Sequence, residues 1–428
     1  MDTIFAQATA PGKAGVSIVR VSGPNALEAG RLFNVDLDTV DRKVARLQDS
    51  DGGLIDIAFV LSFEKGRSFT GEPVVEFHVH GSRAIVARVL DRLSAAGYRH
   101  AEPGEFTRRA LENGQLDLAQ VEGLADLIDA ETEEQRRQAV RVLDGAIGKL
   151  VEGWRSRLIR AAALLEATID FAEEDIPENV FPEVTELLSS VHQELKREAE
   201  GAEIRERVRD GFEVAIIGPP NVGKSTLLNR LAGRDAAITS EHAGTTRDVI
   251  EVNMDLRGIP VTMLDTAGLR DAEDAVERIG IDLARRRAAD ADIRIQLIAS
   301  PDDRVERYSE DDIILLGKAD SRPLEGIDGV SGLTGLGVDD LVDRVAALLS
   351  DRVMSAGAAT RARHAVALRE GVVLIAAVLD RIAEGDIETV DLLAEDVRTA
   401  TRSLDSLVGR IDVESLLDEI FSSFCIGK

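Results

Sequence analysis

The sequence predicts a multidomain protein of α/β and α parts, in which an α/β domain interrupts a central helical domain that follows an N-terminal α+β domain. Short apolar runs separated by glycine turns fill residues 1–117, which is typical of strands. Apolar residues at three- and four-residue spacing dominate 118–209 and 351–428, as in helices. Region 210–350 opens with a buried-strand run and a glycine-rich loop. The 428 residues suffice for roughly two to four domains.

The N-terminal domain, residues 1–117, is predicted to be a compact α+β domain. Its predicted strands and helix lie at 15–23, 56–61, 74–81 and 84–96. Alternation along 74–81 places Glu76, His78 and His80 on one face. These are metal-ligating residue types, but no cysteine or third cluster accompanies them, so a polar strand face is favoured over a zinc site.

The helical domain is predicted in two parts, 118–209 and 351–428. The first part is interrupted at Pro177 and Pro182, because proline breaks helices. Asp210-Gly211 then leads into the α/β domain at 210–350. The second part is predicted to contain helices at 360–384, 387–407 and 414–424. Close chain ends at the insertion point permit this layout.

A phosphate-binding loop is predicted at 218–225, where the residues are Gly-Pro-Pro-Asn-Val-Gly-Lys-Ser. Its glycines let successive N–H groups point at a phosphate, Lys224 can reach the β- and γ-phosphates, and the Ser225 hydroxyl can bind Mg²⁺. An apolar run at 214–217 precedes the loop and a helical pattern at 226–231 follows it. This strand–loop–helix context predicts a nucleoside triphosphate site.

Two later motifs indicate GTP. Asp265-Thr266-Ala267-Gly268 follows an apolar strand, where an acidic residue supports Mg²⁺ and the glycine N–H faces a γ-phosphate. Between the motifs, residues 243–248 are Ala-Gly-Thr-Thr-Arg-Asp, and a threonine there can close over Mg²⁺. Each motif is weak alone, but their order and spacing favour a Ras-like GTPase domain.

The base-recognition segment departs from the usual Asn-Lys-x-Asp, because Gly317 precedes Lys318 and Asp320. Asp320 can still accept hydrogen bonds from guanine, and the Lys318 stem can lie along the base. The missing amide contact is worth about 0.5–1.5 kcal/mol, so we expect GTP preference with weakened binding. The last loop at the base is predicted to be Val330-Ser331-Gly332-Leu333.

Hydrolysis requires a positioned water, yet Leu269 occupies the position where many GTPases have glutamine. Asn221 offers a side-chain oxygen that can hold a monovalent cation beside the phosphates, supplying positive charge. Glu277 lies close enough downstream to orient water, although the residues alone favour a solvated carboxylate at a helix start.

Composition limits the remaining classes. The net charge of −27 argues against tight RNA binding by this chain alone, because such binding depends on Lys and Arg neutralising phosphates. The longest basic run, Arg285-Arg286-Arg287, fits a solvated helix face. A single cysteine, Cys425, no secretory leader and no apolar run of ~18–20 residues predict a cytoplasmic protein.

The whole chain resembles the tRNA modification GTPase MnmE (TrmE) family. Besides the nucleotide motifs, the resemblance rests on segments in every region: Asp2-Thr3-Ile4 with Ala6-Gln7-Ala8-Thr9, Arg20-Val21-Ser22-Gly23, Ser68-Phe69-Thr70-Gly71-Glu72, Pro103-Gly104-Glu105-Phe106-Thr107, Leu116–Glu122 and the terminal Cys425-Ile426-Gly427-Lys428.

The resemblance implies a folate-binding N-terminal domain, a split helical domain and an inserted GTPase domain. It implies a homodimer through the N-terminal domain. With the FAD-dependent partner MnmG, the family installs a (carboxymethyl)aminomethyl-type group at carbon 5 of the wobble uridine of certain tRNAs. Pairing of GTPase domains with GTP and K⁺ bound stimulates hydrolysis in the family, which fits Leu269 and Asn221.

The resemblance also implies site residues. Glu277 matches the water-orienting glutamate, and Lys224 and Asn221 complete the catalytic set. The implied Mg²⁺ ligands are Ser225 and Thr246, and the implied K⁺ ligands are Asn221, Ser240, His242 and Thr245. The implied contacts to 5-formyltetrahydrofolate are Arg20, Glu76, Lys428 and Gln115, where the family usually has lysine in place of Gln115. The remaining predicted GTP contacts are Val222, Gly223, Thr226, Glu241, Ala243, Gly244, Asp265, Thr266, Ala267, Gly268, Lys318, Asp320, Ser331, Gly332 and Leu333.

Two alternatives stay open from sequence. A GTP-gated scaffold with little hydrolysis would fit Gly317 and the short segment between Asp265 and Gly317, but the retained Lys224 and Glu277 argue against it. A ribosome-assembly GTPase would share the Asn221 and Thr-Thr-Arg-Asp features. That class does not explain the N-terminal segments or the terminal Cys-Ile-Gly-Lys. Cys425 fits a packed apolar residue as well as a chemical role.

Overall fold

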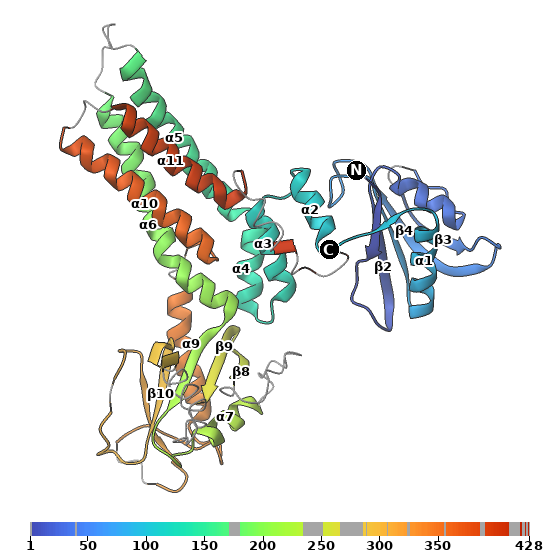
Figure 1. Cartoon of the computed structure of the whole chain (residues 1–428). Helices are drawn as coiled ribbons and strands as arrows, with labels where there is room; N and C mark the ends of the chain where they lie inside the picture. Colours follow the sequence, from blue (N-terminus) through green and yellow to red (C-terminus); the bar gives the residue numbers. More distant parts are fainter. Residues whose placement is uncertain are drawn as a thin grey trace, which may run out of the picture. The chain divides into compact units, whose positions relative to one another are not determined.

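The computed structural model describes residues 2–38, 41–170, 180–233, 251–265, 286–287, 289–305, 307–322, 326–354, 357–385, 390–410, 420–421, 424 and 427. These residues form two compact units. One unit comprises Met1–Ala125 with Asp405–Lys428, and the other comprises Asp126–Leu404 (Figure 1).

A mixed six-stranded sheet forms the N-terminal part of the first unit, with strand order β3-β4-β5-β2-β1-β6. The elements are β1 (Ile4–Gln7), β2 (Ala14–Ser22), η1 (Ala26–Phe33), β3 (Asp41–Gln48), β4 (Leu54–Phe63), β5 (Val74–Gly81), α1 (Arg83–Ala95), β6 (Arg99–His100) and α2 (Glu105–Glu112). Neighbouring strands pair antiparallel except β1 and β6, which are parallel. One face is buried on α1 and η1 around Phe33, Phe77 and Leu93. The predicted α+β class is confirmed, although β1 and β3 were not foreseen.

The last described residues of the chain pack within this first unit. Phe421 and Phe424 contact each other and form a small apolar cluster with Val121 of α3 (Leu118–Asp129). The backbone of Gly427 lies against that of Gln7 at the end of β1. Both ends of the chain therefore belong to the same unit.

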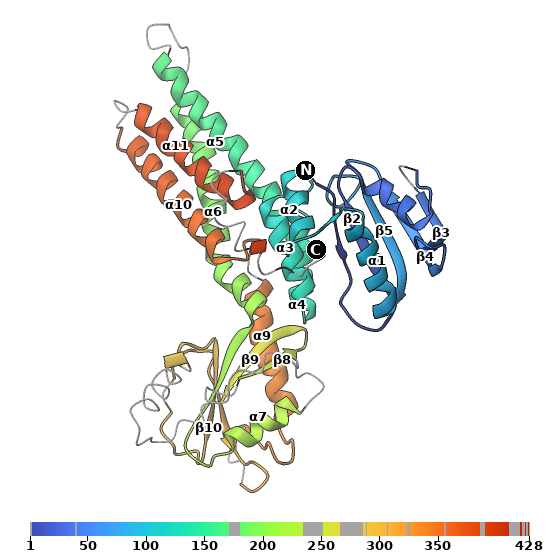
Figure 2. The same ribbon diagram turned by 45° about the vertical axis from the view of Figure 1, so that its right-hand side comes forward.

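Long helices dominate one part of the second unit. They are α4 (Glu133–Leu143), α5 (Ala146–Asp170), α6 (Phe181–Asp210), α10 (Ala362–Ala383) and α11 (Val390–Asp405). The short η2 (Ser406–Val408) that follows α11 belongs to the first unit. Figures 1 and 2 show α5, α6, α10 and α11 side by side. Gly371 of α10 permits close approach, because its Cα faces Leu195 of α6 and Leu404 of α11. The two helical parts, which are far apart in sequence, thus form one bundle.

The α/β part of the second unit contains a six-stranded sheet with order β12-β11-β10-β7-β9-β8. Its elements are β7 (Phe212–Ile217), α7 (Lys224–Ala232), β8 (Glu251–Leu256), β9 (Ile259–Asp265), β10 (Ile293–Ile298), β11 (Ile313–Gly317), β12 (Gly329–Val330) and α9 (Val338–Met354). β8 is antiparallel to β9, and the other pairs are parallel. Helices α7 and α9 bury the apolar side chains of one sheet face. This is the predicted α/β domain, and it is inserted between the two helical parts as expected.

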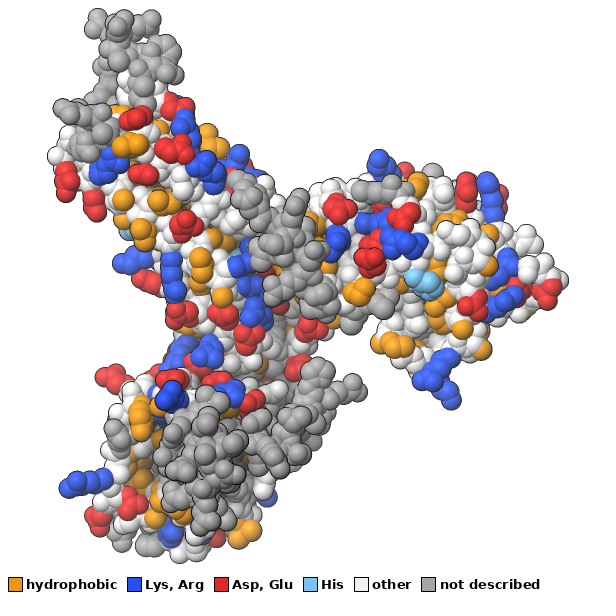
Figure 3. Space-filling view, viewed as in Figure 1, with side chains coloured by type: hydrophobic (Ala, Val, Ile, Leu, Met, Phe, Trp, Pro, Cys, Tyr) orange, Lys and Arg blue, Asp and Glu red, His pale blue; other side chains and the backbone are white. Residues whose placement is uncertain are grey.

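Acidic and basic side chains are intermixed on the face of the molecule shown in Figure 3. Among the described helices, none combines the length and apolar content that a bilayer crossing requires.

Candidate functional site

The phosphate loop begins where the central strand of the sheet ends. β7 lies between β9 and β10, and it pairs with both in parallel. The chain leaves β7 at Ile217 and enters α7 at Lys224. Ligands of open parallel sheets bind at the carboxyl ends of strands where the connections diverge to the two sides, and this loop occupies that position.

The loop backbone adopts the left-handed conformations that turn N–H groups inward. Gly218 has φ 144°, Asn221 has φ 59° and Gly223 has φ 113°. A side chain at Gly218 would collide with the Leu297 carbonyl group of β10, so glycine is required there. Asn221 is the non-glycine residue in this turn with positive φ, a conformation asparagine tolerates. Such a concave run of amides is suited to an anion.

Lys224 is buried at the start of α7, and its Nζ donates hydrogen bonds to the carbonyl oxygens of Gly218 and Pro219 at 2.8 and 3.0 Å. The ammonium group is thereby held inside the curve of the loop. Ser225 and Thr226 are exposed in the first turn of α7, where free N–H groups and the helix dipole favour negative charge. The predicted phosphate-contacting residues of this loop therefore converge on one side of the sheet.

Asp265 ends β9 next to the loop. It pairs with Ile216 in the parallel ladder between β9 and β7, so its backbone lies one strand away from the phosphate loop. Several other predicted contacts lie outside the described residues: Ser240, Glu241, His242, Ala243, Gly244, Thr245, Thr246, Thr266, Ala267, Gly268 and Glu277.

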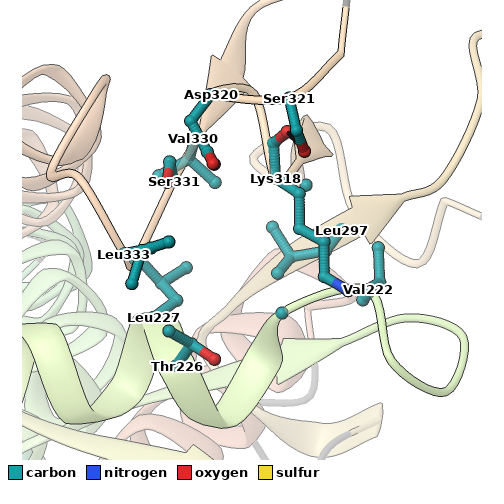
Figure 4. Close-up of a pocket in the computed structure, with 13 residues that line it drawn as sticks. Val222, Thr226, Leu227, Leu297, Lys318, Asp320, Ser321, Val330, Ser331 and Leu333 are labelled. Carbon is teal, nitrogen blue, oxygen red and sulfur yellow. Dashed lines mark hydrogen bonds between the residues drawn. The ribbon is translucent and has the colours of Figure 1, made fainter.

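A pocket of about 300 Å³ lies beside the phosphate loop (Figure 4). It is lined by Val222, Gly223, Thr226, Leu227, Leu297, Gly317, Lys318, Asp320, Ser321, Val330, Ser331, Gly332 and Leu333. Four separate segments meet here: the phosphate loop with α7, the end of β10 at Leu297, the end of β11 with its following turn, and the end of β12 with its following turn. Predicted base contacts Lys318, Asp320 and Ser331 all line this one pocket.

Backbone hydrogen bonds join the two base-facing turns. The Ala319 N–H donates to the Val330 carbonyl group at 3.2 Å, and β11 pairs with β12 through Leu316 and Gly317. Asp320 and Lys318 are exposed at the pocket, and Lys318 has a positive φ of 56°. An exposed carboxylate and a lysine stem beside apolar walls suit a planar base that presents hydrogen-bond donors.

Leu297 and Ser321 line the pocket but were not among the predicted contacts. Leu297 is the next-to-last residue of β10, the strand beside β7, so its place at this sheet edge follows from the strand order. Strand order is not visible in one sequence, which is why Leu297 was not predicted, whereas Ser321 directly follows the predicted Asp320.

A second polar cluster lies on the sheet of the first unit. Arg20 Nε donates to Glu76 Oε1 at 2.9 Å, and Glu76 Oε2 lies 3.1 Å from His78 Nε2. The Arg20 guanidinium group lies 5.5 Å from the ring centre of Phe69 and 5.6 Å from that of Phe106. The predicted Arg20 and Glu76 are thus in direct contact, while their histidine and aromatic neighbours were not predicted as part of the site.

Gln115 lies near the loop that contains Phe69 and Gly71, beside the Arg20 cluster. It is exposed, and a Cβ at Gly71, two residues after Phe69, would lie 3.1 Å from the Gln115 Cγ atom. Lys428 and Cys425 lie outside the described residues, whereas Gly427 lies against β1. No grouping of three metal-ligating side chains occurs among the described residues.

Comparisons with known proteins agree with this organisation. Residues 3–115 match the family described as GTP-binding protein TrmE N-terminus, and residues 118–425 match that described as MnmE helical domain. The chain is 58% identical over 433 residues to a tRNA modification GTPase MnmE of Ruegeria pomeroyi, and 48% identical over 431 residues to that of Paracoccus denitrificans. Both alignments cover all of this chain and all of the relative.

Among solved structures, a crystal structure of Aquifex aeolicus Era is similar with a TM-score of 0.25 and 26% identity, covering 32% of this chain and 56% of that one.

Proposed function

The chain belongs to the family of the tRNA modification GTPase MnmE, and from this premise we propose that it is a K⁺-activated GTPase that modifies the wobble uridine of tRNA together with an FAD-dependent partner. The single observation that supports the nucleotide part best is the convergence of Lys224, Lys318 and Asp320 around one loop and one pocket. The group that is added to the tRNA is a (carboxymethyl)aminomethyl group at carbon 5 of the wobble uridine.

In the proposed GTP site, Lys224 and the loop amides hold the β- and γ-phosphates, and Asp320 accepts from the guanine N–H groups. Ser225 and Thr246 hold Mg²⁺, which supplies charge neutralisation at the phosphates. Ser225 fits this role because it is exposed in the first turn of α7, beside the loop. Phosphate contacts of the residues between Ser240 and Thr246, and of the segment 265–268, complete the proposed site.

K⁺ is proposed to bind at Asn221, with Ser240, His242 and Thr245. Asn221 fits because it is exposed in the phosphate loop with φ 59°, next to the amides that face the phosphates. A cation there supplies positive charge where negative charge develops during hydrolysis. Glu277 orients the attacking water in this proposal.

A one-carbon folate is proposed to bind at Arg20, Glu76, Gln115 and Lys428. The arrangement around Arg20 supports this, because a cation held by a carboxylate between two aromatic rings suits an anionic ligand with a flat ring. The donor is 5-formyltetrahydrofolate or a related folate. At the outer sheet face, Glu76 offers acceptor oxygens for the ring's N–H groups.

The proposed homodimer forms through the N-terminal sheet. Val44 and Phe59 are directly opposite each other on β3 and β4, and they are 70% and 41% exposed. Ile57 on the same strand as Phe59 is 46% exposed. Apolar side chains grouped on an outer sheet face are suited to contact with a second copy. The GTPase domains would pair across this dimer, and an MnmG-type partner would provide much of the grip on tRNA.

The proposed domains are 1–117, 118–209, 210–350 and 351–428, and the proposed compartment is the cytoplasm.

The proposed tRNA modification is tested in cells of the source organism that lack the gene for this protein. Their tRNA is digested, and the C5-substituted wobble uridine is measured by mass spectrometry. We expect the nucleoside to disappear, to return with the full chain, and to stay absent with Lys224→Ala. Gly153→Ala is the matched control, because a Cβ there meets nothing within 4 Å. Persistence of the nucleoside without the gene would contradict the proposal.

A further inference from the structure

Gly317 stands where the base-recognition segment of many GTPases has asparagine, and the structure shows why a side chain is excluded. A Cβ atom built on Gly317 would overlap the carbonyl oxygen of Val222 and lie 2.9 Å from its Cγ2 atom. The carbonyl oxygen is backbone, so no side-chain rotation relieves the overlap. The end of β11 therefore rests directly on the phosphate loop.

Neither the phosphate loop at Val222 nor the end of β11 at Gly317 can move without disturbing other contacts. Val222 is buried in the core of the domain, between Asn221 with φ 59° and Gly223 with φ 113°. Displacing the loop would disturb these left-handed residues and the phosphate-binding amides. Because protein interiors are close-packed, even a single added atom at such a contact costs stability.

The opposite side is fixed by two sets of hydrogen bonds. Gly317 pairs with Val330 in the β11–β12 ladder. Arg322 Nη1 donates to the carbonyl groups of Gly317 at 3.1 Å and of Ala299 at 2.9 Å, which joins the ends of β11 and β10. The residue after Gly317 is Lys318, and the stem of Lys318 passes over Gly223, 3.7 Å from where a Cβ of Gly223 would lie. The contact at Gly317 thus determines the distance between the phosphate loop and the turn after β11, which carries Lys318 and Asp320.

We infer that Gly317 is a positioning residue for guanine recognition: it replaces a side-chain tether with direct backbone contact, and so sets the alignment of Asp320 with the base. The missing asparagine amide is not a defect that asparagine would repair. Any side chain at 317 separates the two walls of the pocket and moves Asp320 away from the base. This inference rests on the proposed guanine site.

The test is equilibrium binding of fluorescent GDP and IDP to the full-length protein and to Gly317→Ala and Gly317→Asn. IDP lacks the 2-amino group, so the GDP:IDP affinity ratio reports the contact of Asp320 with the base. We expect both variants to bind GDP at least about tenfold more weakly, with the ratio falling toward one. Gly153→Ala should leave both quantities unchanged.

The ratio separates positioning from general damage, because a merely unstable domain would lose GDP and IDP affinity by the same factor. Unchanged or tighter GDP binding by Gly317→Asn, or weaker binding with an unchanged ratio, would overturn the inference. Failure of the guanine site itself would be visible separately, since the parent protein would then bind ADP as tightly as GDP. Circular dichroism of each variant checks that the domain is folded.

Discussion

Asp320 is exposed at the turn after β11 and lines the pocket with Lys318, whose backbone has a positive φ of 56°. In the proposed complex its two oxygens accept from N1–H and the 2-amino group of guanine. Hydrogen bonds to a charged acceptor are worth about 1.5–3 kcal/mol, more than neutral ones. Specificity for the base should therefore depend on this carboxylate more than on the apolar walls.

The Asp320→Asn substitution should change the preference of the site from guanine to xanthine. Xanthine carries a carbonyl group at C2 in place of the amino group, and the asparagine amide can donate to it. We expect GDP affinity to fall by roughly ten- to a hundredfold and XDP affinity to exceed it. Competition binding with GDP and XDP measures both. Equal losses for the two nucleotides would place Asp320 outside the base contact.

Gln115→Lys should strengthen binding of 5-formyltetrahydrofolate. The glutamine is exposed beside Gly71, and its Nε2 donates only a 3.5 Å hydrogen bond to the Asn113 carbonyl group among the contacts described. A lysine would add a cation near an anionic ligand, worth about two- to fivefold in affinity at an exposed position. Calorimetric titration measures this, with Gln115→Glu as the opposite-charge control. Weaker binding by the lysine variant would argue against a role for position 115.

The nucleotide site could be predicted from sequence as far as its motifs are local. The phosphate loop needs a strand, glycines and Lys224 in succession, and each requirement is visible in consecutive residues. The role of Gly317 was predicted only as a missing amide, because its contact with Val222 joins segments far apart in the chain. Steric exclusion of this kind depends on tertiary distance, which residue type does not encode.

Helices α5 and α6 are joined by a charged cluster. Arg157 donates from both terminal nitrogens to the two oxygens of Glu194, at 2.7 and 2.6 Å, and the Trp154 indole N–H donates to the same carboxylate at 2.9 Å. The Arg157 hydrogen bond is the main cause that lowers the pKa of Glu194 from 4.5 to about 2. This bidentate geometry is the strongest form of such a pair.

The contribution of Glu194 to stability should depend on pH. Its folded pKa lies below its unfolded value, so the contribution is fully present above pH 4.5 and is lost as the pH falls from 4.5 toward 2. The destabilisation caused by Glu194→Gln should therefore shrink over this range. Urea unfolding followed by fluorescence of Trp154, the single tryptophan, measures it.

The control for this effect is Glu183→Gln, which removes the exposed pair with Arg160 between the same two helices. Exposed pairs contribute about 0–1 kcal/mol, so a small change is expected there. If the destabilisation caused by Glu194→Gln stayed constant down to about pH 3, the ionised form of Glu194 would not be the source of the stabilisation.

The connection from β10 to β11 differs from the helical crossover usual between parallel strands. No helix occurs among the described residues of 299–312. A buried ion pair lies here instead: Arg294 Nε donates to Asp312 Oδ1 at 2.8 Å, and Asp312 also accepts from the Tyr308 and Ser309 N–H groups. Burial alone would raise the pKa of Asp312, but these hydrogen bonds outweigh it and the pKa is lowered.

Arg294→Met should destabilise the domain by about 3–5 kcal/mol, because it leaves the Asp312 charge buried without its partner. Arg294→Met with Asp312→Leu should recover most of the loss. Hydrogen exchange of peptides from β10 and β11 measures the local effect. Arg344→Met, which removes an exposed pair with Asp328, is the control. If the double variant were no more stable than Arg294→Met alone, the stabilisation would come from the hydrogen bonds that Asp312 accepts from the backbone.

At the level of elements, periodicity predicted the long helices well but not their breaks. The stretch 118–169 contains α3, α4 and α5, separated at the capping box of Thr132 with Gln135 and at Gly145 with φ 82°. These breaks depend on local caps that a continuous apolar pattern hides. β1 was missed because a four-residue strand is too short to show alternation.

At the level of the whole molecule, the inserted domain is connected to the helical bundle at two points. α6 leads directly into β7 through Gly211, which has φ 97°. On the return, the connector at 357–361 is tied to α6: Glu198 accepts from the Ala358 N–H at 2.6 Å, and Arg205 donates to the Gly357 carbonyl group at 2.8 Å. These side-chain to backbone hydrogen bonds attach the start of the second helical part to α6.

The central claim is that hydrolysis depends on K⁺ and on Glu277. The measurement is the rate of GTP hydrolysis by the full-length protein in K⁺ and in Na⁺ at equal ionic strength, with Glu277→Ala alongside. We predict stimulation by K⁺ on the order of a hundredfold, as expected for a charge placed at the transition state, and its loss in the variant. Equal, negligible rates in both salts would contradict the account and favour a GTP-gated scaffold.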